Sequence, residues 1–93
     1  MLPFTDSQIE EALLELPGWS QEGEAIVKTY EFGDFPTAMA FMASAVGAID
    51  TMDHHPEWTN VYSRVDVRLT SHDVGGVTDR DLRLATTLEG LAG

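Results

Sequence analysis

The stretch that decides the fold runs from Asp34 to Ser71, DFPTAMAFMASAVGAIDTMDHHPEWTNVYSRVDVRLTS, because its hydrophobic period changes partway along. The first half predicts a helix, since Asp34 is a suitable N-cap and Pro36 falls in the first turn, where its missing N–H costs little. A continuous apolar stripe follows at helical spacing, made of Ala38, Phe41, Met42, Ala45, Ile49 and Met52. Pro56 prevents the helix from continuing, so the chain must turn before the second half begins.

The second half, from Thr59 to Ser71, is predicted to be extended. Its apolar residues alternate with polar ones, as in a strand that buries one face; they are Val61, Val65, Val67 and Leu69. This pattern fits one bent strand or two short strands that meet near Ser63-Arg64, and the sequence leaves both open.

A helix is predicted upstream, over residues 5–16. Its apolar side chains fall on one helical face, and they are Ile9, Ala12, Leu13 and Leu16. Thr5 and Gln8 have the spacing of a capping box, and Pro17-Gly18 ends the helix.

Two strands and a last helix complete the chain. Residues 19–22 and 25–32 have the pattern of strands around a turn at residues 22–24, with Lys28 the one polar residue on the face that carries Ile26, Tyr30 and Phe32. After a loop at residues 73–76, Thr78 is the expected N-cap of a helix. Its predicted buried stripe consists of Leu82, Ala85 and Leu88.

These elements predict an α+β fold in one domain that spans residues 1–93. The order is α-β-β-α-β-β-α when the extended stretch counts as two strands, which gives an antiparallel sheet of about four strands with three helices packed on one face. A domain of this length has one modest core, so self-association would add to its stability.

The composition narrows the class of function. The formal net charge is −11, from 16 acidic and 5 basic residues, which disfavours direct binding to nucleic acid or to an anionic membrane surface. The chain has no cysteine, which excludes disulfides and a thiolate nucleophile. Because no secretory signal or membrane-spanning run is recognisable, a soluble cytoplasmic protein is expected.

The three histidines, His54, His55 and His72, are the side chains best suited to chemistry. Histidine gives and takes protons near neutral pH, so this group predicts an acid–base site. Asp50 and Asp53 stand at the end of the central helix, where the helix dipole makes an acid unfavourable by a few tenths of a kcal/mol to about 1 kcal/mol. A ring N–H of His54 or His55 is a candidate partner that would hold them there.

Simpler interpretations stand beside this one. The His-His-Pro run also fits a polar segment that follows the end of a helix. His72 fits a residue at a strand end that bonds to the backbone, and Asp81 fits a capping box with Thr78. Trp19 and Trp58 fit the core, and the methionines of the central helix fit the core or an oligomer contact. Three histidines and a carboxylate also suit zinc or iron, but adjacent residues in extended backbone point in opposite directions, which argues against a shared ion at His54 and His55.

A family resemblance emerges from the spacing Asp50-x-x-x-His54-His55-Pro56, followed by Tyr62, His72 and Asp81. Together with the stretch LTSHDVGGVT before Asp81, it resembles the signature of the pterin-4a-carbinolamine dehydratases (4a-hydroxytetrahydrobiopterin dehydratases). The segments at residues 16–19 and 32–35 are similar too, so the resemblance covers essentially the whole chain. Two departures are visible: Asp50 stands where many members have Glu, and Ser71 where many have Thr.

The resemblance implies dehydration of 4a-hydroxytetrahydropterin to quinonoid dihydropterin, in tetrahydropterin recycling, with no cofactor and no metal. It also implies an antiparallel sheet with helices on one side, and a homodimer or homotetramer. On this basis His54 and His72 are expected to be the acid–base pair, with His55 positioning the pterin or sharing in catalysis. Asp81 is expected to orient His72, Arg80 or the substrate. The expected substrate-binding or orienting set is Asp50, Asp53, Trp58, Ser71, Arg80 and Asp81.

A second class of function follows from the same resemblance. Animal relatives also serve as dimerisation cofactors of a transcription factor through their helical face. An interaction module is therefore the alternative, with an adaptable contact surface made of Met39, Met42 and Met52. Retention of all three histidines favours the enzyme.

Overall fold

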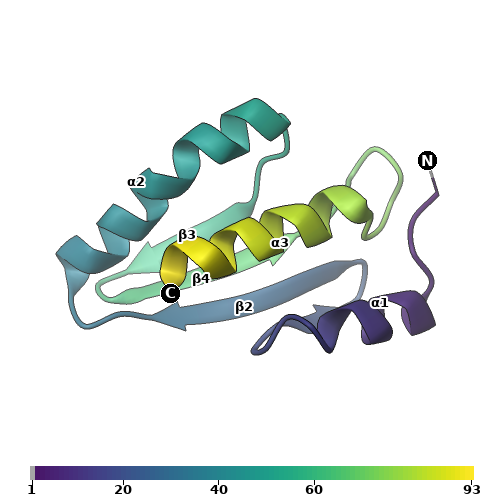
Figure 1. The fold of residues 1–93 in the computed structure, drawn as a ribbon, viewed down its shortest axis with the longest axis horizontal. Helices are drawn as coiled ribbons and strands as arrows, with labels where there is room; N and C mark the ends of the chain where they lie inside the picture. Colours follow the sequence, from purple (N-terminus) through teal and green to yellow (C-terminus); the bar gives the residue numbers. More distant parts are fainter. Residues whose placement is uncertain (1) are drawn as a thin grey trace.

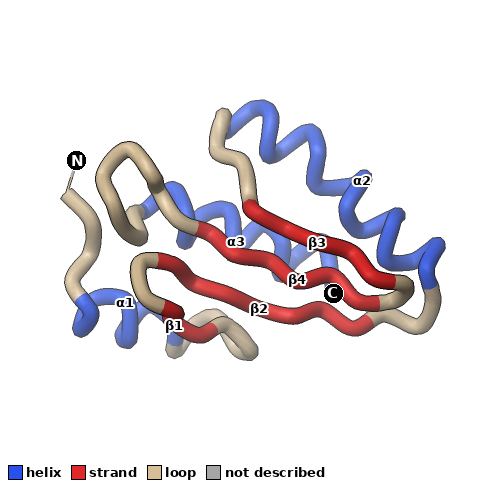
Figure 2. The backbone as a smooth tube through the Cα atoms, turned by 180° about the vertical axis from the view of Figure 1, so that it is seen from behind, coloured by secondary structure: helices blue, strands red, loops and turns tan. Residues whose placement is uncertain are grey.

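The computed structural model describes residues 2–93 and contains the predicted elements in the predicted order. They are α1 (Asp6–Leu13), β1 (Ser20–Glu22), β2 (Ala25–Glu31), α2 (Phe35–Met52), β3 (Glu57–Val61), β4 (Arg64–Leu69) and α3 (Asp79–Ala92). The strands form one antiparallel sheet in the order β1-β2-β4-β3. All three helices lie on one side of it (Figure 1), and the view from behind shows the other face of the sheet in front of them (Figure 2).

The register of β2 and β4 determines which side chains face the helices. Ile26 pairs with Leu69 and Tyr30 with Val65, so these side chains share the covered face, where all four are buried. The helices complete the core with Ala38, Phe41, Ala45 and Ile49 of α2 and with Leu84, Ala85 and Leu88 of α3. The prediction for α3 was partly wrong, because Leu84 is fully buried whereas Leu82 is half-buried at the margin of the core.

The extended stretch that the sequence left open forms two strands joined by a tight turn at Tyr62-Ser63. Tyr62 has φ 52°, in the left-handed region that few residues other than glycine adopt. The amide of Asn60 holds the turn by donating to the carbonyl oxygens of Tyr62 and Arg64, at 3.0 and 2.9 Å. β3 begins at Glu57, two residues before the predicted start at Thr59, so it follows Pro56 directly.

Hydrogen bonds at the helix ends confirm the predicted caps. Thr5 and Gln8 form a capping box on α1, and the side chain of Asp34 accepts from the backbone N–H of Thr37 at 2.9 Å. α1 ends at Leu13 rather than Leu16, although Leu16 is buried in the turn that follows. α2 ends at Met52, and the φ of 49° at its C-cap, Asp53, reverses the chain and turns the next residue toward the interior.

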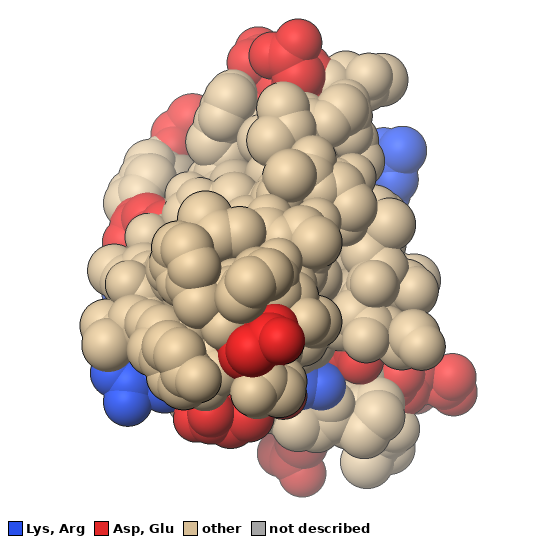
Figure 3. Space-filling view, turned by 90° about the vertical axis from the view of Figure 1, so that its left-hand side faces the viewer, with Lys and Arg blue, Asp and Glu red and all other residues tan. Residues whose placement is uncertain are grey.

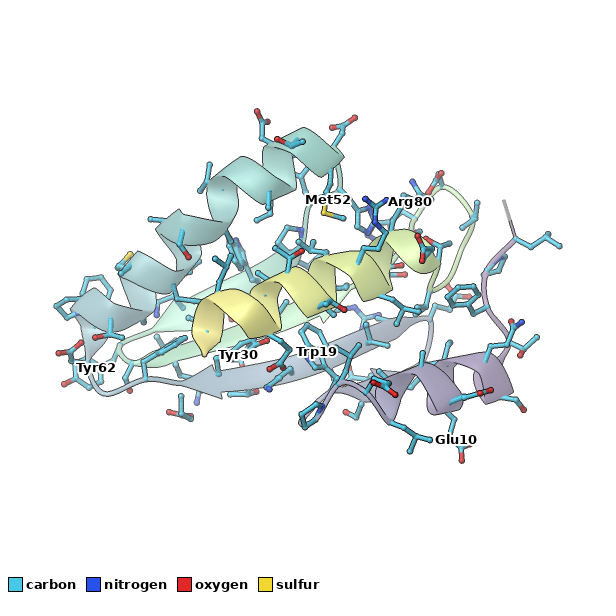
Figure 4. All side chains as sticks on the ribbon, in the orientation of Figure 1. Glu10, Trp19, Tyr30, Met52, Tyr62 and Arg80 are labelled. Carbon is cyan, nitrogen blue, oxygen red and sulfur yellow. The ribbon has the colours of Figure 1, made fainter. Side chains whose placement is uncertain are left out.

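Glu89 ties α3 to the sheet. One of its carboxylate oxygens accepts from Trp19 Nε1 at 2.7 Å, from the Tyr30 hydroxyl at 3.1 Å and from Lys28 Nζ. Trp19 and Tyr30 lie beside the C-terminal half of α3 in Figure 4. This contact explains why a lysine occupies the covered face of β2, the one polar interruption seen in the sequence. No helix within residues 2–93 has the length and apolar character that crossing a membrane requires.

Candidate active site

His54 is the buried histidine, and its partner is Asp81. His54 follows the left-handed Asp53, and only 7% of its surface is exposed. Its Nε2 lies 2.5 Å from Oδ1 of Asp81, which is fully buried in the first turn of α3. The contact joins residues 27 positions apart in the chain and places an imidazole against a carboxylate away from water.

The second oxygen of Asp81 caps α3. Oδ2 accepts from the backbone N–H of Thr78 and from the hydroxyl of Ser71, both at 2.9 Å. The Ser71 and Thr78 hydroxyl oxygens are 2.8 Å apart. A buried carboxylate is costly unless its oxygens are hydrogen-bonded, and here both are. The predicted capping box is therefore confirmed, and Asp81 contacts His54 with the oxygen that the cap does not use.

This arrangement fixes which nitrogen of His54 is free. An ionised carboxylate only accepts hydrogen bonds, so the contact with Asp81 requires the proton on Nε2. In neutral imidazole the lone pair then resides on Nδ1, for which residues 2–93 supply no hydrogen-bond partner. The pair therefore presents one basic nitrogen and a carboxylate that would stabilise the imidazolium ion.

His72 lies on the surface and has a different acidic partner. Its Nε2 is 2.6 Å from Oε1 of Glu57, the first residue of β3. Glu57 belongs to the open face of the sheet, where it borders a broad hollow of about 790 Å³. Ser71 and His72 are adjacent in the sequence, but their side chains contact different carboxylates. The Ser71 hydroxyl donates to Asp81, and His72 Nε2 contacts Glu57.

His55 lines a small hollow between α2 and β3. The hollow has a volume of about 220 Å³ and is bordered by Val46, Ile49, Asp50, His55, Pro56 and Trp58. It brings together Asp50, His55 and Trp58, which the sequence predicted as site residues. The predicted ring contacts of the two aspartates are weak or lacking: Asp53 Oδ1 is 3.8 Å from His55 Nε2, too long for a hydrogen bond, and within residues 2–93 Asp50 accepts from neither ring.

Arg80 and Asp73 border the His54 side of the site. Arg80 Nη2 donates to Asp73 Oδ1 at 2.7 Å, while the buried Nε of Arg80 has no partner among residues 2–93. In Figure 4 Arg80 lies close to Met52, between the end of α2 and the start of α3. The hydrogen bond from Arg80 holds the pKa of Asp73 below its usual value, and the nearby His54 acts in the same direction.

The partners of Asp81 also differ from expectation. Asp81 contacts His54 and neither His72 nor the Arg80 side chain, because Glu57 and Asp73 are the acidic partners of those two. Sequence reasoning missed Glu57 and Asp73 as site residues. The available signal was their position, since each stands within three residues of a histidine in the motif. Within residues 2–93, no three histidine or acidic side chains are grouped so as to hold a metal ion.

Comparison with known proteins gives consistent matches over nearly the whole chain. The family model described as pterin 4 alpha carbinolamine dehydratase matches residues 2–91. A protein of Nitrobacter winogradskyi named for pterin-4-alpha-carbinolamine dehydratase is 50% identical over 91 residues, 96% of this chain and 90% of its own. A protein of the same name from Rhodopseudomonas palustris is 52% identical over 91 residues, and this match also covers 96% of this chain and 90% of the relative.

Two solved structures are also similar. The crystal structure of a transcriptional coactivator/pterin dehydratase from Brucella melitensis has a TM-score of 0.95 and 44% identity, covering 98% of this chain and 99% of that one. A pterin dehydratase-like RuBisCO assembly factor of the alpha-carboxysome has a TM-score of 0.67 and 17% identity, covering 81% and 87%. The second likeness shows a shared fold alone.

Proposed function

The chain belongs to the pterin 4 alpha carbinolamine dehydratase family, and we propose that it converts 4a-hydroxytetrahydropterin to quinonoid dihydropterin and water. The observation that carries the proposal is the buried pair of His54 and Asp81, formed by two residues of the family signature. A histidine held in one tautomer beside a carboxylate is suited to moving protons near neutral pH. The reaction would regenerate dihydropterin for tetrahydropterin recycling.

The proposed chemistry needs two proton transfers. The bond from carbon 4a to its hydroxyl oxygen breaks, the departing oxygen receives a proton and leaves as water, and a ring nitrogen loses a proton as the new C=N bond forms. Two positioned imidazoles would perform both transfers, each contributing on the order of 10²–10⁴ in rate. These steps require no cofactor or metal.

His54 and His72 are the proposed acid–base pair. We assign proton removal to Nδ1 of His54, because Asp81 would stabilise the imidazolium ion that results. We assign protonation of the leaving hydroxyl to His72, whose exposure to solvent allows it to be protonated again after each turnover.

The hollow between α2 and β3 is the proposed place for part of the pterin ring. Trp58 offers an aromatic wall for a flat heterocycle, and His55 stands at the border to contact the ring or its hydroxyl. The exposed carboxylate of Asp50 is suited to accept from the amino and ring N–H groups of a pterin. Ser71, Arg80 and Asp53 complete the proposed orienting set.

A stopped-flow assay of 4a-hydroxytetrahydropterin dehydration tests this function, with wild type measured beside His54→Ala. We expect strong acceleration by the wild type and a loss of at least about 10²-fold in the variant, because the proton acceptor is removed. Circular dichroism of the variant controls for folding. Wild-type turnover in folded His54→Ala would refute the assigned site, and no acceleration by folded wild type would refute the reaction.

A second candidate function is an interaction module. It is favoured by the apolar side chains that α2 exposes, including Phe35, Met39 and Val46. The related Brucella melitensis protein is named as both coactivator and dehydratase. Recovery of a stoichiometric protein partner by co-purification, together with no pterin turnover, would favour this function over the enzyme.

A further inference from the structure

We propose that Glu57 is the positioning residue of His72. By accepting from Nε2–H at 2.6 Å, it would hold the imidazole in one orientation and one tautomer, with Nδ1 left to act on the substrate. The inference rests on the proposed function, in which His72 protonates the leaving hydroxyl. It assigns a role in the site to Glu57, which directly follows His54-His55-Pro56 in the sequence.

Glu57 is itself held in place. It follows Pro56 at the start of β3 and is the register partner of Arg68 on β4. Its second oxygen, Oε2, lies 3.7 Å from Nε of Arg68, whose Nη1 is 3.3 Å from the carboxylate of Glu22 on β1. The strand register and the ion pair with Arg68 therefore hold the Glu57 carboxylate on the open face of the sheet, beside His72. A group fixed in this way can orient the imidazole that it binds.

The contact between His72 and Glu57 resembles the buried contact between His54 and Asp81. Both His54 and His72 direct Nε2 to a carboxylate, Asp81 inside the protein and Glu57 at the surface, so both leave Nδ1 available. The side chain of His72 is 78% exposed, and Glu57 is the group that restrains it. Exposed ion pairs contribute little to stability, so a purely structural role for this pair predicts almost no effect of its removal. A positioning role predicts a selective loss of turnover.

The kinetic test compares Glu57→Ala and Glu57→Gln with Glu22→Ala. Glu22 is the matched control because it is the other acidic partner of Arg68 and does not touch His72. We expect kcat to fall about tenfold to hundredfold in Glu57→Ala with little change in KM, the range seen for groups that orient metal-bound histidines. Glu57→Gln keeps an accepting oxygen and should recover part of the loss, whereas Glu22→Ala should behave as wild type. Thermal unfolding of all three variants should stay close to that of wild type.

A double-mutant cycle and a spectrum separate positioning from other effects. If Glu57 acts through His72, the double variant Glu57→Ala/His72→Ala is no slower than His72→Ala alone. In the substrate-free protein, at a pH that keeps the His72 imidazole neutral, its ¹⁵N NMR spectrum should show the Nε2–H tautomer in wild type and a mixture in Glu57→Ala. Unchanged kcat, additive losses or an unchanged tautomer would overturn the inference. If folded wild type shows no dehydratase activity, the proposed function fails, and the tautomer spectrum still decides whether Glu57 sets the state of His72.

Discussion

At the scale of single residues, the position that matters most is Asp81, because one carboxylate serves both the cap of α3 and His54. Replacing it with Asn leaves one accepting oxygen for three donors. Either His54 loses its acceptor, which allows the wrong tautomer, or the buried N–H of Thr78 does. We expect Asp81→Asn to lower kcat by roughly 10²–10⁴ and the free energy of unfolding by about 1–3 kcal/mol. Rate assays and urea denaturation measure the two effects.

Thr78→Ala is the control for Asp81→Asn. It weakens the same cap, at a cost of about 0.5–2 kcal/mol, without touching His54. Its turnover per folded molecule should therefore stay near that of wild type. Equal losses of rate in the two variants would mean that Asp81 acts only through the fold.

The burial of Asp81 also explains why the predicted buried stripe of α3 was partly wrong. The residues of α3 that face the core are Asp81, Leu84, Ala85 and Leu88, a spacing of i, i+3, i+4 and i+7 in which the first member is a carboxylate. A search for apolar periodicity reads that position as polar and shifts the stripe to Leu82. The pairing of His54 with Asp81 was also unpredictable, because it depends on how α3 packs on the sheet. The sequence predicted the residue types, and the docking of α3 determines their partners.

At the scale of elements, Glu89 makes the contact between α3 and β2 sensitive to acid. Burial alone would raise the pKa of Glu89, but hydrogen bonds from Lys28, Trp19 and Tyr30 hold it below its usual value. Burial, together with the Glu89 carboxylate, raises the pKa of Tyr30 well above its usual value, so its hydroxyl remains a donor. A depressed folded-state pKa means that stability is present above the unfolded value, about 4.3 for Glu, and is lost as pH falls through the folded value.

The variant Glu89→Gln isolates this contribution. We expect it to have a lower Tm than wild type at pH 7, and we expect the two Tm values to converge as the pH is lowered from about 5 to 3, because protonation removes the same charge from wild type. Thermal scans at a series of pH values provide the measurement. Parallel Tm curves over this range would show that ionised Glu89 does not stabilise the fold.

The elements themselves were largely predictable because their signals are local. Thr5, Asp34 and Thr78 each cap a helix within three residues of their own position, and the alternation of Val65, Val67 and Leu69 is confirmed as one face of β4. The turn between β3 and β4 was less predictable. It places Tyr62 in a left-handed conformation with no glycine to mark it, and the amide of Asn60 stabilises it.

At the scale of the whole molecule, charge and apolar surface are unevenly distributed. The net charge is −11, yet Asp50 is the only charged residue of α2. From the end that carries the start of α2 and the β3–β4 turn, most of the surface is uncharged, with an acidic group on the lower part of the face and further acidic and basic groups mainly toward its margin (Figure 3). Repulsion between copies is smallest where charge is lacking, so the exposed face of α2 is the surface best suited to self-association.

We therefore expect the protein to form a dimer or tetramer through α2, and the variant Val46→Glu to be a monomer of 10.2 kDa by light scattering. Val46 is 59% exposed and borders the hollow beside His55, so a charge there would oppose a second copy and would also alter the site. Leu14→Glu is the matched control, because Leu14 is 82% exposed just beyond α1. Added salt should strengthen association of the wild type by screening the −11 charge. A monomeric wild type, or a Val46→Glu variant that remains associated, would show that α2 is not the contact.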